Sequence, residues 1–112
     1  MLQKIAPILP AYSITETDLF FRNKLKFLTH NYGNYLVVKK DQVEIHYSLW
    51  AGNGKFTTSS CYIFENNIED LFAKLSSMDI INPKGDLKDN SWGRKEFYLL
   101  DNNGNILRFG GM

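Results

Sequence analysis

A set of strand residues combines aromatic rings with charged groups, the residue types that could hold a small organic ligand. Each member alternates along its segment with apolar residues, so it should point away from the face that packs on a helix. Pockets for organic ligands typically have aromatic walls with a few polar groups placed among them. The members are Glu44, His46, Trp50, Ser60, Tyr62, Trp92, Arg94, Glu96, Tyr98 and Arg108. The set predicts a ligand-facing surface, although each residue taken alone fits an ordinary solvated position on an open sheet.

Reaction chemistry has weaker signals than binding. His46 could act as a general base, but no serine or cysteine stands at a motif spacing from it, which favours a cleft-lining or pH-sensitive histidine. Glu44 and Glu96 could form an acid pair, and sequence spacing leaves this open across separate strands. Cys61 falls on the helix-packed side of its strand and is expected to be buried and inert. The sequence therefore predicts no catalytic residue and no cofactor.

Size and composition predict one folded domain. The chain has 112 residues and a formal net charge of +1, so residues 1–112 are expected to form a single domain that binds neither nucleic acid nor a membrane. The one cysteine allows no internal disulfide and fits a reducing compartment. Pro7 and Pro10 interrupt the N-terminal segment, which lacks a long apolar run. We therefore expect no signal peptide or membrane span, and a cytoplasmic location.

The first half of the chain predicts a strand, a helix and two further strands. "KIAPILPAYS" is apolar, and its prolines favour an edge position. Ser13, Thr15 or Thr17 could cap the helix that follows. The segment "NYGNYLVVKKDQVEIHYSLW" predicts strands Tyr35–Lys39 and Gln42–Trp50, joined by a tight turn at Lys40 and Asp41.

The second half repeats this order. "SSCYIFE" predicts a strand, "NNIEDLFAKLSSM" a helix with an asparagine cap, and "WGRKEFYLLD" with "GNILRFG" a hairpin. The polar segment between helix and hairpin could hold a short strand near residues 80–81 and a long exposed loop over residues 82–91. "TDLFF" matches "EDLFA", and "YLVVKKDQVEIHY" matches "YLLDNNGNILRFG". The repeat predicts an α+β fold with two βαβββ modules, about 1–52 and 56–112, each a curved mixed sheet with a helix on one face.

An open curved sheet also predicts association. Each module covers one face of its sheet with a helix and leaves the other face and the strand edges to be covered. Symmetric homodimers are the commonest way to cover such surfaces. We therefore expect a homodimer.

Several stretches resemble the vicinal-oxygen-chelate superfamily, which includes glyoxalases, bleomycin-resistance proteins and dioxygenases. They are "PILPAYS", "VEIHY", "SCYIFENNIEDLF" and "SWGRKEFYLLDNNGNILRFG". The resemblance covers nearly the whole chain and is strongest to bleomycin-resistance proteins. It implies paired βαβββ modules, a homodimer that can exchange N-terminal strands, and sequestration of an aromatic antibiotic without chemistry. The alternative that it leaves open is a metal-dependent lyase, isomerase or dioxygenase of the same superfamily.

The resemblance also implies where a metal would be held. The enzyme branches use four side chains, usually His and Glu, and these positions fall on Pro7, Glu44, Ser60 and Arg108. Only Glu44 is a usual ligand, because proline has no donor side chain and a guanidinium stays protonated. We therefore expect no metal, with Arg108 paired to Glu44. A third possibility is a dimeric interaction module with no ligand.

Overall fold

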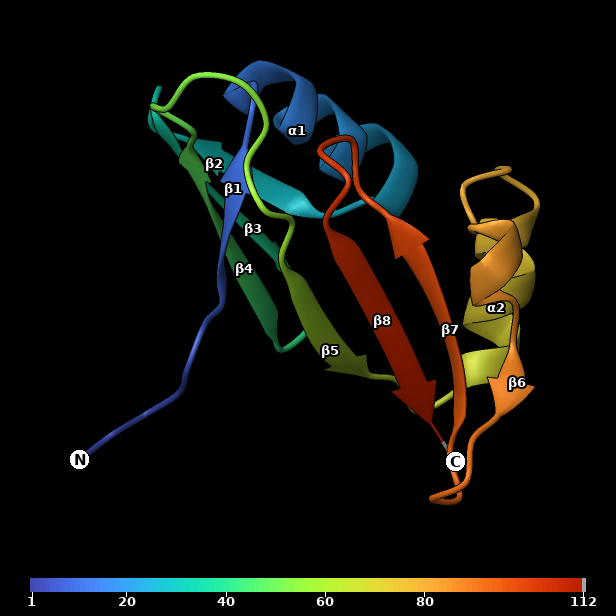
Figure 1. Cartoon of the computed structure of the whole chain (residues 1–112). Coiled ribbons are helices and arrows are strands. Elements are labelled where there is room, and N and C mark those ends of the chain that lie inside the picture. The colour runs from blue at the N-terminus through green and yellow to red at the C-terminus, as the bar shows by residue number, and fades with distance from the viewer. Residues whose placement is uncertain (112) are drawn as a thin grey trace. The chain divides into compact units, whose positions relative to one another are not determined.

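The computed structural model describes residues 1–111, which fold as two compact units (Figure 1). The first unit is Met1–Ser59 and the second begins at Ser60. Each contains one sheet of four strands, in the orders β1-β4-β3-β2 and β5-β8-β7-β6. The predicted α+β class with two βαβββ modules is confirmed. The assignment of the whole chain to a single domain stays a prediction, as does the homodimer.

The first unit places a helix on one face of its sheet. Ser13 caps this helix, because its hydroxyl accepts a hydrogen bond from the Glu16 N–H at 3.2 Å. A turn of π-helix continues it and ends at Lys26, whose φ is 61°. β1 runs parallel to β4, and the other neighbours are antiparallel. The elements are β1 (Ile8–Ala11), α1 (Ile14–Phe20), η1 (Phe21–Leu25), β2 (Leu28–Asn31), β3 (Tyr35–Lys40) and β4 (Val43–Leu49).

The second unit repeats the plan with a longer connection before its last hairpin. α2 packs on β7 and β8. The connection holds a short 3-10 helix, capped by the Asn82 side chain, and a two-residue strand that pairs with β7. The elements are β5 (Ser60–Phe64), α2 (Ile68–Ser76), η2 (Pro83–Gly85), β6 (Lys88–Asp89), β7 (Lys95–Leu100) and β8 (Ile106–Gly111).

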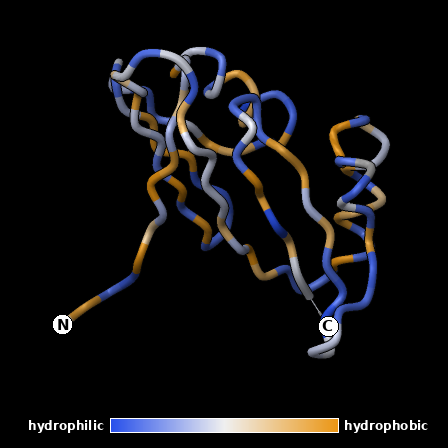
Figure 2. Tube along the Cα trace, viewed as in Figure 1, coloured by the Kyte–Doolittle hydropathy of each residue, from blue (hydrophilic) through white to orange (hydrophobic). Residues whose placement is uncertain are grey.

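The core of each unit follows the alternation seen in the sequence. Figure 2 shows hydrophobic and hydrophilic residues interspersed along β4 and β8. In β4 the side chains of Ile45 and Tyr47 are buried, and in β8 those of Leu107 and Phe109 are buried. Each buried side chain of this size contributes about 1.5–3 kcal/mol. The residues between them, His46 and Arg108, therefore point to the opposite, open face of each sheet.

The hairpin turns differ between the units. β3 and β4 are joined by Asp41 and Gln42, with Asp41 at φ 53°. β7 and β8 are joined by a longer turn, residues 101–105, in which Gly104 takes φ 86°. The buried Asp101 carboxylate organises this turn, because it accepts hydrogen bonds from the N–H groups of Asn103 and Asn105.

Several predicted bounds were wrong. β1 begins at Ile8, not at Lys4, because Pro7 has no N–H for a ladder and precedes the paired residues. β2 and β6 were missed, since both are short edge strands without a run of alternating apolar residues. The bridge between Ile81 and Leu99 agrees with the short strand expected at residues 80–81. The loop expected over residues 82–91 contains η2 and β6.

Candidate ligand-binding site

The open face of the second sheet brings most of the expected residues together. Tyr62 of β5 pairs in register with Arg108 of β8, and Arg108 pairs with Tyr98 of β7. Cross-strand partners share one face, so these side chains stand in a row. The "aromatic face" is defined as the residues Tyr62, Phe64, Trp92, Arg94, Glu96, Tyr98 and Arg108.

Arg108 occupies the centre of this row. Its guanidinium carbon lies 5.2 Å from the centre of the Tyr98 ring, within cation–π distance. Its Nη1 atom lies 3.7 Å from Glu96 Oε1. The side chain of Glu96 is 12% exposed and that of Arg108 is 41% exposed. The cation is therefore partly neutralised from one side and accessible from the other.

The Tyr62 side chain extends over Gly110 to reach Glu96. Its hydroxyl donates to the other oxygen of that carboxylate, Oε2, at 2.6 Å. Gly110 pairs in register with Phe64 and Glu96, and a Cβ placed there would stand 1.8 Å from the Tyr62 hydroxyl. Burial and the hydrogen bond to Glu96 raise the pKa of Tyr62. Two features therefore position the Tyr62 ring. Gly110 leaves space for its hydroxyl, and the Glu96 carboxylate accepts a hydrogen bond from it.

The turn over residues 90–94 positions Trp92 and Arg94. The Asn90 side-chain oxygen accepts hydrogen bonds from the N–H of Trp92 at 3.2 Å and of Arg94 at 3.0 Å. Gly93 takes φ 89° in this turn, a conformation that favours glycine. The Asn90 Nδ2 atom is buried and has no hydrogen-bond acceptor within residues 1–111. The turn thus delivers an aromatic ring and a cation to the start of β7.

Both side chains join the aromatic face. The Arg94 guanidinium carbon lies 4.8 Å from the ring centre of Phe64 and 5.5 Å from that of Trp92. The ring centres of Tyr62 and Trp92 are 6.0 Å apart. Phe64 is 66% exposed and Trp92 is 59% exposed. Large rings left this open are available to stack on a planar ligand.

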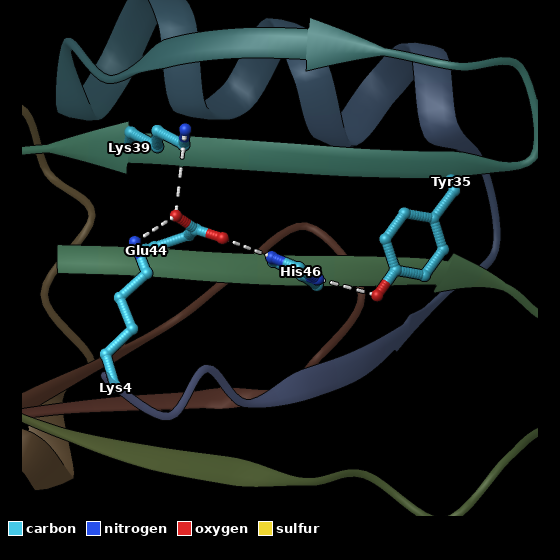
Figure 3. Close-up of polar contacts among 5 residues, drawn as sticks. All are labelled: Lys4, Tyr35, Lys39, Glu44 and His46. Carbon is cyan, nitrogen blue, oxygen red and sulfur yellow. Dashed lines mark hydrogen bonds and ion pairs between the residues drawn. The ribbon is translucent and has the colours of Figure 1, made fainter. Parts of the chain in front are cut away.

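The open face of the first sheet carries a hydrogen-bonded polar network instead (Figure 3). Glu44 Oε1 accepts from Lys4 Nζ at 2.7 Å, and Lys39 Nζ lies 3.7 Å from the same oxygen. Glu44 Oε2 is 2.6 Å from His46 Nε2, and His46 Nδ1 is 2.7 Å from the Tyr35 hydroxyl. A carboxylate only accepts, so Nε2 donates, and Nδ1 of the neutral ring accepts from Tyr35.

This network fixes the charge of Glu44. The hydrogen bonds from Lys4 and then His46, with the nearby charges of Lys4 and Lys39, lower the pKa of Glu44 from 4.5 to about 2. The carboxylate is therefore ionised at neutral pH. Both of its oxygens are already engaged by groups of its own unit.

Trp50 lies outside this network. It follows the end of β4, its Nε1 donates to the Gly54 carbonyl at 3.2 Å, and its ring lies against Gly52. Its ring centre is 5.7 Å from that of Phe56, which stacks on Tyr12 at 4.0 Å. The structure thus gives Trp50 a packing role in the loop after β4.

Ser60 and Cys61 lie on opposite sides of β5. Ser60 is the exposed first residue of β5, on the side of Tyr62. Cys61 points the other way, and burial raises the pKa of its thiol to about 11, with a further contribution from the Asp101 charge. A thiol that stays protonated is a poor nucleophile, which agrees with the expected inert cysteine.

One expectation about the metal-ligand positions changes. The residue of β1 that pairs with His46, and so shares its face, is Ile8, whereas Pro7 is in phase with the buried Leu9. Pro7 was thus misplaced, because the strand phase is set by pairing with β4. Within its own unit, the carboxylate beside Arg108 is that of Glu96; pairing with Glu44 stays a prediction.

The residues at these positions do not fit a divalent metal. Glu44 is engaged by Lys4 and His46, Ser60 offers a neutral hydroxyl, and Arg108 is a permanent cation. Residues 1–111 contain no group of three or more His, Cys, Asp or Glu side chains placed to hold a metal ion. No reaction step through a metal follows from this donor set.

Sequence reasoning missed several residues of these two faces. Phe64 shares the phase of Tyr62 and could have been included on that signal. Lys4 and Tyr35 join the Glu44 network from outside its strand, and nothing in their local sequence indicates it. Gly110 and Asn90 act through backbone and steric effects, for which the sequence has only the weak signals of a glycine in a strand and an asparagine before a turn.

Known proteins resemble this chain in sequence and in fold. No protein-family model matches the sequence. The chain is 30% identical over 129 aligned positions to the bleomycin resistance protein of Geobacillus stearothermophilus, covering 97% of this chain and 96% of that protein. The chain belongs to the bleomycin-resistance protein family. The resemblance expected from the sequence motifs is therefore confirmed.

The fold of this bleomycin-resistance family member agrees with solved structures. The bleomycin resistance determinant encoded on transposon Tn5 superposes with a TM-score of 0.83 at 16% identity, covering 98% of each chain. A bleomycin-binding protein complexed with bleomycin gives a TM-score of 0.81 at 16% identity, covering 99% of each chain. At such identities the likeness shows the fold. Within residues 1–111, no helix is long and apolar enough to span a bilayer.

Proposed function

We propose that this protein binds and sequesters a small aromatic antibiotic of the bleomycin type, without chemical conversion. The observation that carries the proposal is the aromatic face, where Trp92 and Phe64 are largely exposed beside two guanidinium groups. An aromatic wall with a few oriented polar groups is the usual make-up of a site for an organic ligand. The curated relative is named for bleomycin resistance, and one structural neighbour holds bleomycin.

Each part of the aromatic face has a distinct role in this proposal. Trp92, Tyr62 and Tyr98 stack on planar rings of the ligand. Arg94, Arg108 and Glu96 orient its polar substituents, as charge-assisted hydrogen bonds add both strength and direction. Ser60 extends this surface at the start of β5.

The first unit contributes candidates on its own sheet. Glu44 and His46 lie on its open face, and Trp50 lies in the loop that follows β4. We keep these three residues as proposed ligand contacts.

Binding without turnover is part of the proposal. The strongest candidates for acid–base chemistry, Glu44 and His46, already hydrogen bond to each other and to Lys4 and Tyr35. Cys61 is a protonated thiol, so it does not offer a nucleophile. We further propose that the protein is a cytoplasmic homodimer. Stoichiometric metal in the purified protein, measured by elemental analysis, would instead support the lyase, isomerase or dioxygenase alternative.

The two tryptophans allow a direct test. In a Trp50→Phe variant Trp92 is the only tryptophan, and in a Trp92→Phe variant Trp50 is the only one. We expect bleomycin to quench the fluorescence of the variant that retains Trp92, with saturation, and to raise the melting temperature of the native protein. The quenching of Trp50 measures whether that residue also meets the ligand.

Replacing Trp92 with alanine measures how much its ring contributes to the binding free energy. Trp92→Ala is expected to weaken bleomycin binding about tenfold or more, since stacking of this kind is worth about 1–3 kcal/mol. Isothermal titration calorimetry measures the change, and circular dichroism checks that the variant is folded. No quenching and no thermal shift with bleomycin in the native protein would refute bleomycin as the ligand.

A further inference from the structure

Arg94 has no carboxylate partner among residues 1–111, unlike several other cations of this part of the chain. Lys4 and Lys39 flank Glu44, Arg22 pairs with Asp18, and Lys95 pairs with Glu69. No ion pair involves Arg94 within residues 1–111, where its close neighbours are the rings of Phe64 and Trp92. A guanidinium held against rings keeps its N–H edge free for a planar acceptor.

The aromatic face as a whole has a surplus of positive charge. Among its defined residues are two guanidinium groups, Arg94 and Arg108, and one carboxylate, Glu96, which lies beside Arg108. One oxygen of that carboxylate lies beside Arg108, and the other accepts the Tyr62 hydroxyl at 2.6 Å. Lys88 pairs in register with Glu96 and adds a further cation on the same side of the sheet. A negatively charged group is therefore the missing complement.

A second, independent observation lies in the turn that carries Arg94. Asn90 uses its side-chain oxygen to hold the N–H groups of Trp92 and Arg94, while its Nδ2 is buried without an acceptor among the described residues. Buried donors are normally satisfied, so an orphan donor indicates a partner supplied from elsewhere.

We infer that the aromatic face takes a planar aromatic ligand that carries a carboxylate or another oxyanion, with Arg94 receiving the oxyanion. The ring stacks among Trp92, Phe64 and Tyr62, and the oxyanion sits at the N–H edge of Arg94. This inference goes beyond the proposed function, because it assigns an anionic class of aromatic ligand to the same surface, whereas bleomycin is cationic. It distinguishes ligands by charge, which the aromatic rings alone do not.

Matched probes of opposite charge test the inference. 2-Naphthoate and 2-naphthylmethylamine present the same ring with a carboxylate or an ammonium group. We expect 2-naphthoate to bind the native protein about tenfold more tightly by isothermal titration calorimetry, and raised salt to reduce this preference. Equal affinity for the two probes, or tighter binding of the amine, would overturn the inference.

Variants locate the effect at Arg94. Arg94→Gln is expected to lower 2-naphthoate affinity about tenfold and to abolish the preference over the amine. Arg94→Lys, which keeps the charge but loses the planar fork, should retain part of the preference. Arg22→Gln is the matched control, because it removes a paired surface cation of η1, and its affinity should equal that of the native protein. A preference that survives in a folded Arg94→Gln variant would overturn the inference.

Titration with bleomycin distinguishes the oxyanion inference from the proposed function. Bleomycin bound equally well by the native protein and by Arg94→Gln, with no charge preference among the naphthalene probes, would keep the proposed function and reject the oxyanion ligand. Arg94-dependent binding of 2-naphthoate without bleomycin binding would keep the oxyanion site and reject bleomycin as the ligand. Neither probe binding would reject both.

Discussion

The open faces of the two sheets carry different kinds of side chains at equivalent positions. His46 and Arg108 both stand on the fourth strand of their sheet, each between two buried residues. His46 pairs in register with the small apolar residues Ile8 and Val37. Arg108 pairs with Tyr62 and Tyr98. One repeated topology therefore presents a polar group with aliphatic neighbours in one unit and a cation between aromatic rings in the other.

The consequence lies in what remains available for a partner. On the first sheet, Glu44 engages Lys4, Lys39 and His46, and His46 engages Tyr35, so the polar groups satisfy one another. On the second sheet, Trp92 and Phe64 stay largely exposed. A duplicated fold can thus keep the polar groups of one face internally satisfied while the other face leaves large aromatic rings exposed. Variants that disturb equivalent positions on the two faces should separate these roles.

Filling position 110 should have the largest effect, because it removes the space that Tyr62 needs. A Cβ there would stand 1.8 Å from the Tyr62 hydroxyl, so Gly110→Val must swing the ring away and break its bond to Glu96. We expect a loss of about 2 kcal/mol of unfolding free energy and ligand binding weakened more than tenfold. Urea denaturation and calorimetric titration measure the two effects.

Ser48→Val is the matched control on the first sheet. Ser48 is two residues beyond His46, as Gly110 is two beyond Arg108, and it is exposed. Its replacement should change stability by less than about 0.5 kcal/mol and leave binding unaltered. Equal effects of the two valine substitutions would show that the Tyr62 geometry has no special part in binding.

The faces of the strands could be predicted from the sequence because alternation is a local property. Val43 to Leu49 and Lys95 to Leu100 show it clearly, and the burial of Ile45, Phe97 and Leu99 agrees with it. The repeated segments likewise predicted two modules with one sheet order. Motifs such as "SWGRKEFYLLDNNGNILRFG" identified the family, which the comparison with the curated relative confirms.

Side-chain partners could not be predicted, because they depend on register between distant strands. Glu44 meets Lys4, 40 residues away, and Tyr62 meets Glu96, 34 residues away. Alternation placed Tyr62 and Glu96 on one face but gave no hint that Tyr62 leans across Gly110. Trp50 shared the phase of His46, yet its ring turns back on the loop over residues 51–56, because Gly52 leaves room for it. The local alternation of residues determines which face of the sheet a side chain points to, whereas its partner depends on how the strands pair.

A smaller effect is expected from removing only the Tyr62 hydroxyl. Tyr62→Phe keeps the ring and loses the hydrogen bond to Glu96, whose carboxylate still lies beside Arg108. We expect a loss of about 1 kcal/mol of unfolding free energy and affinity reduced about threefold. Tyr35→Phe, which removes the hydroxyl that meets His46 on the first sheet, should reduce affinity less than Tyr62→Phe does. The same loss of affinity in both variants would remove the distinction between the two faces.

The smallest effect concerns the first sheet and is confined to acid. The folded pKa of Glu44, about 2, lies below its ordinary value of 4.5, so its contribution to stability is complete above pH 4.5 and is lost as the pH falls towards 2. The melting temperature of Glu44→Gln should therefore lie below that of the native protein at neutral pH, and the difference should shrink in that window. Asp86→Asn replaces an exposed carboxylate with no ion pair among the described residues and should show no such pH-dependent difference. A gap between native protein and Glu44→Gln that stays constant from pH 7 down to pH 3 would mean that the network around Glu44 does not hold its charge in solution. The first face would then no longer be internally satisfied, and the contrast between the two sheets would rest on the aromatic rings alone.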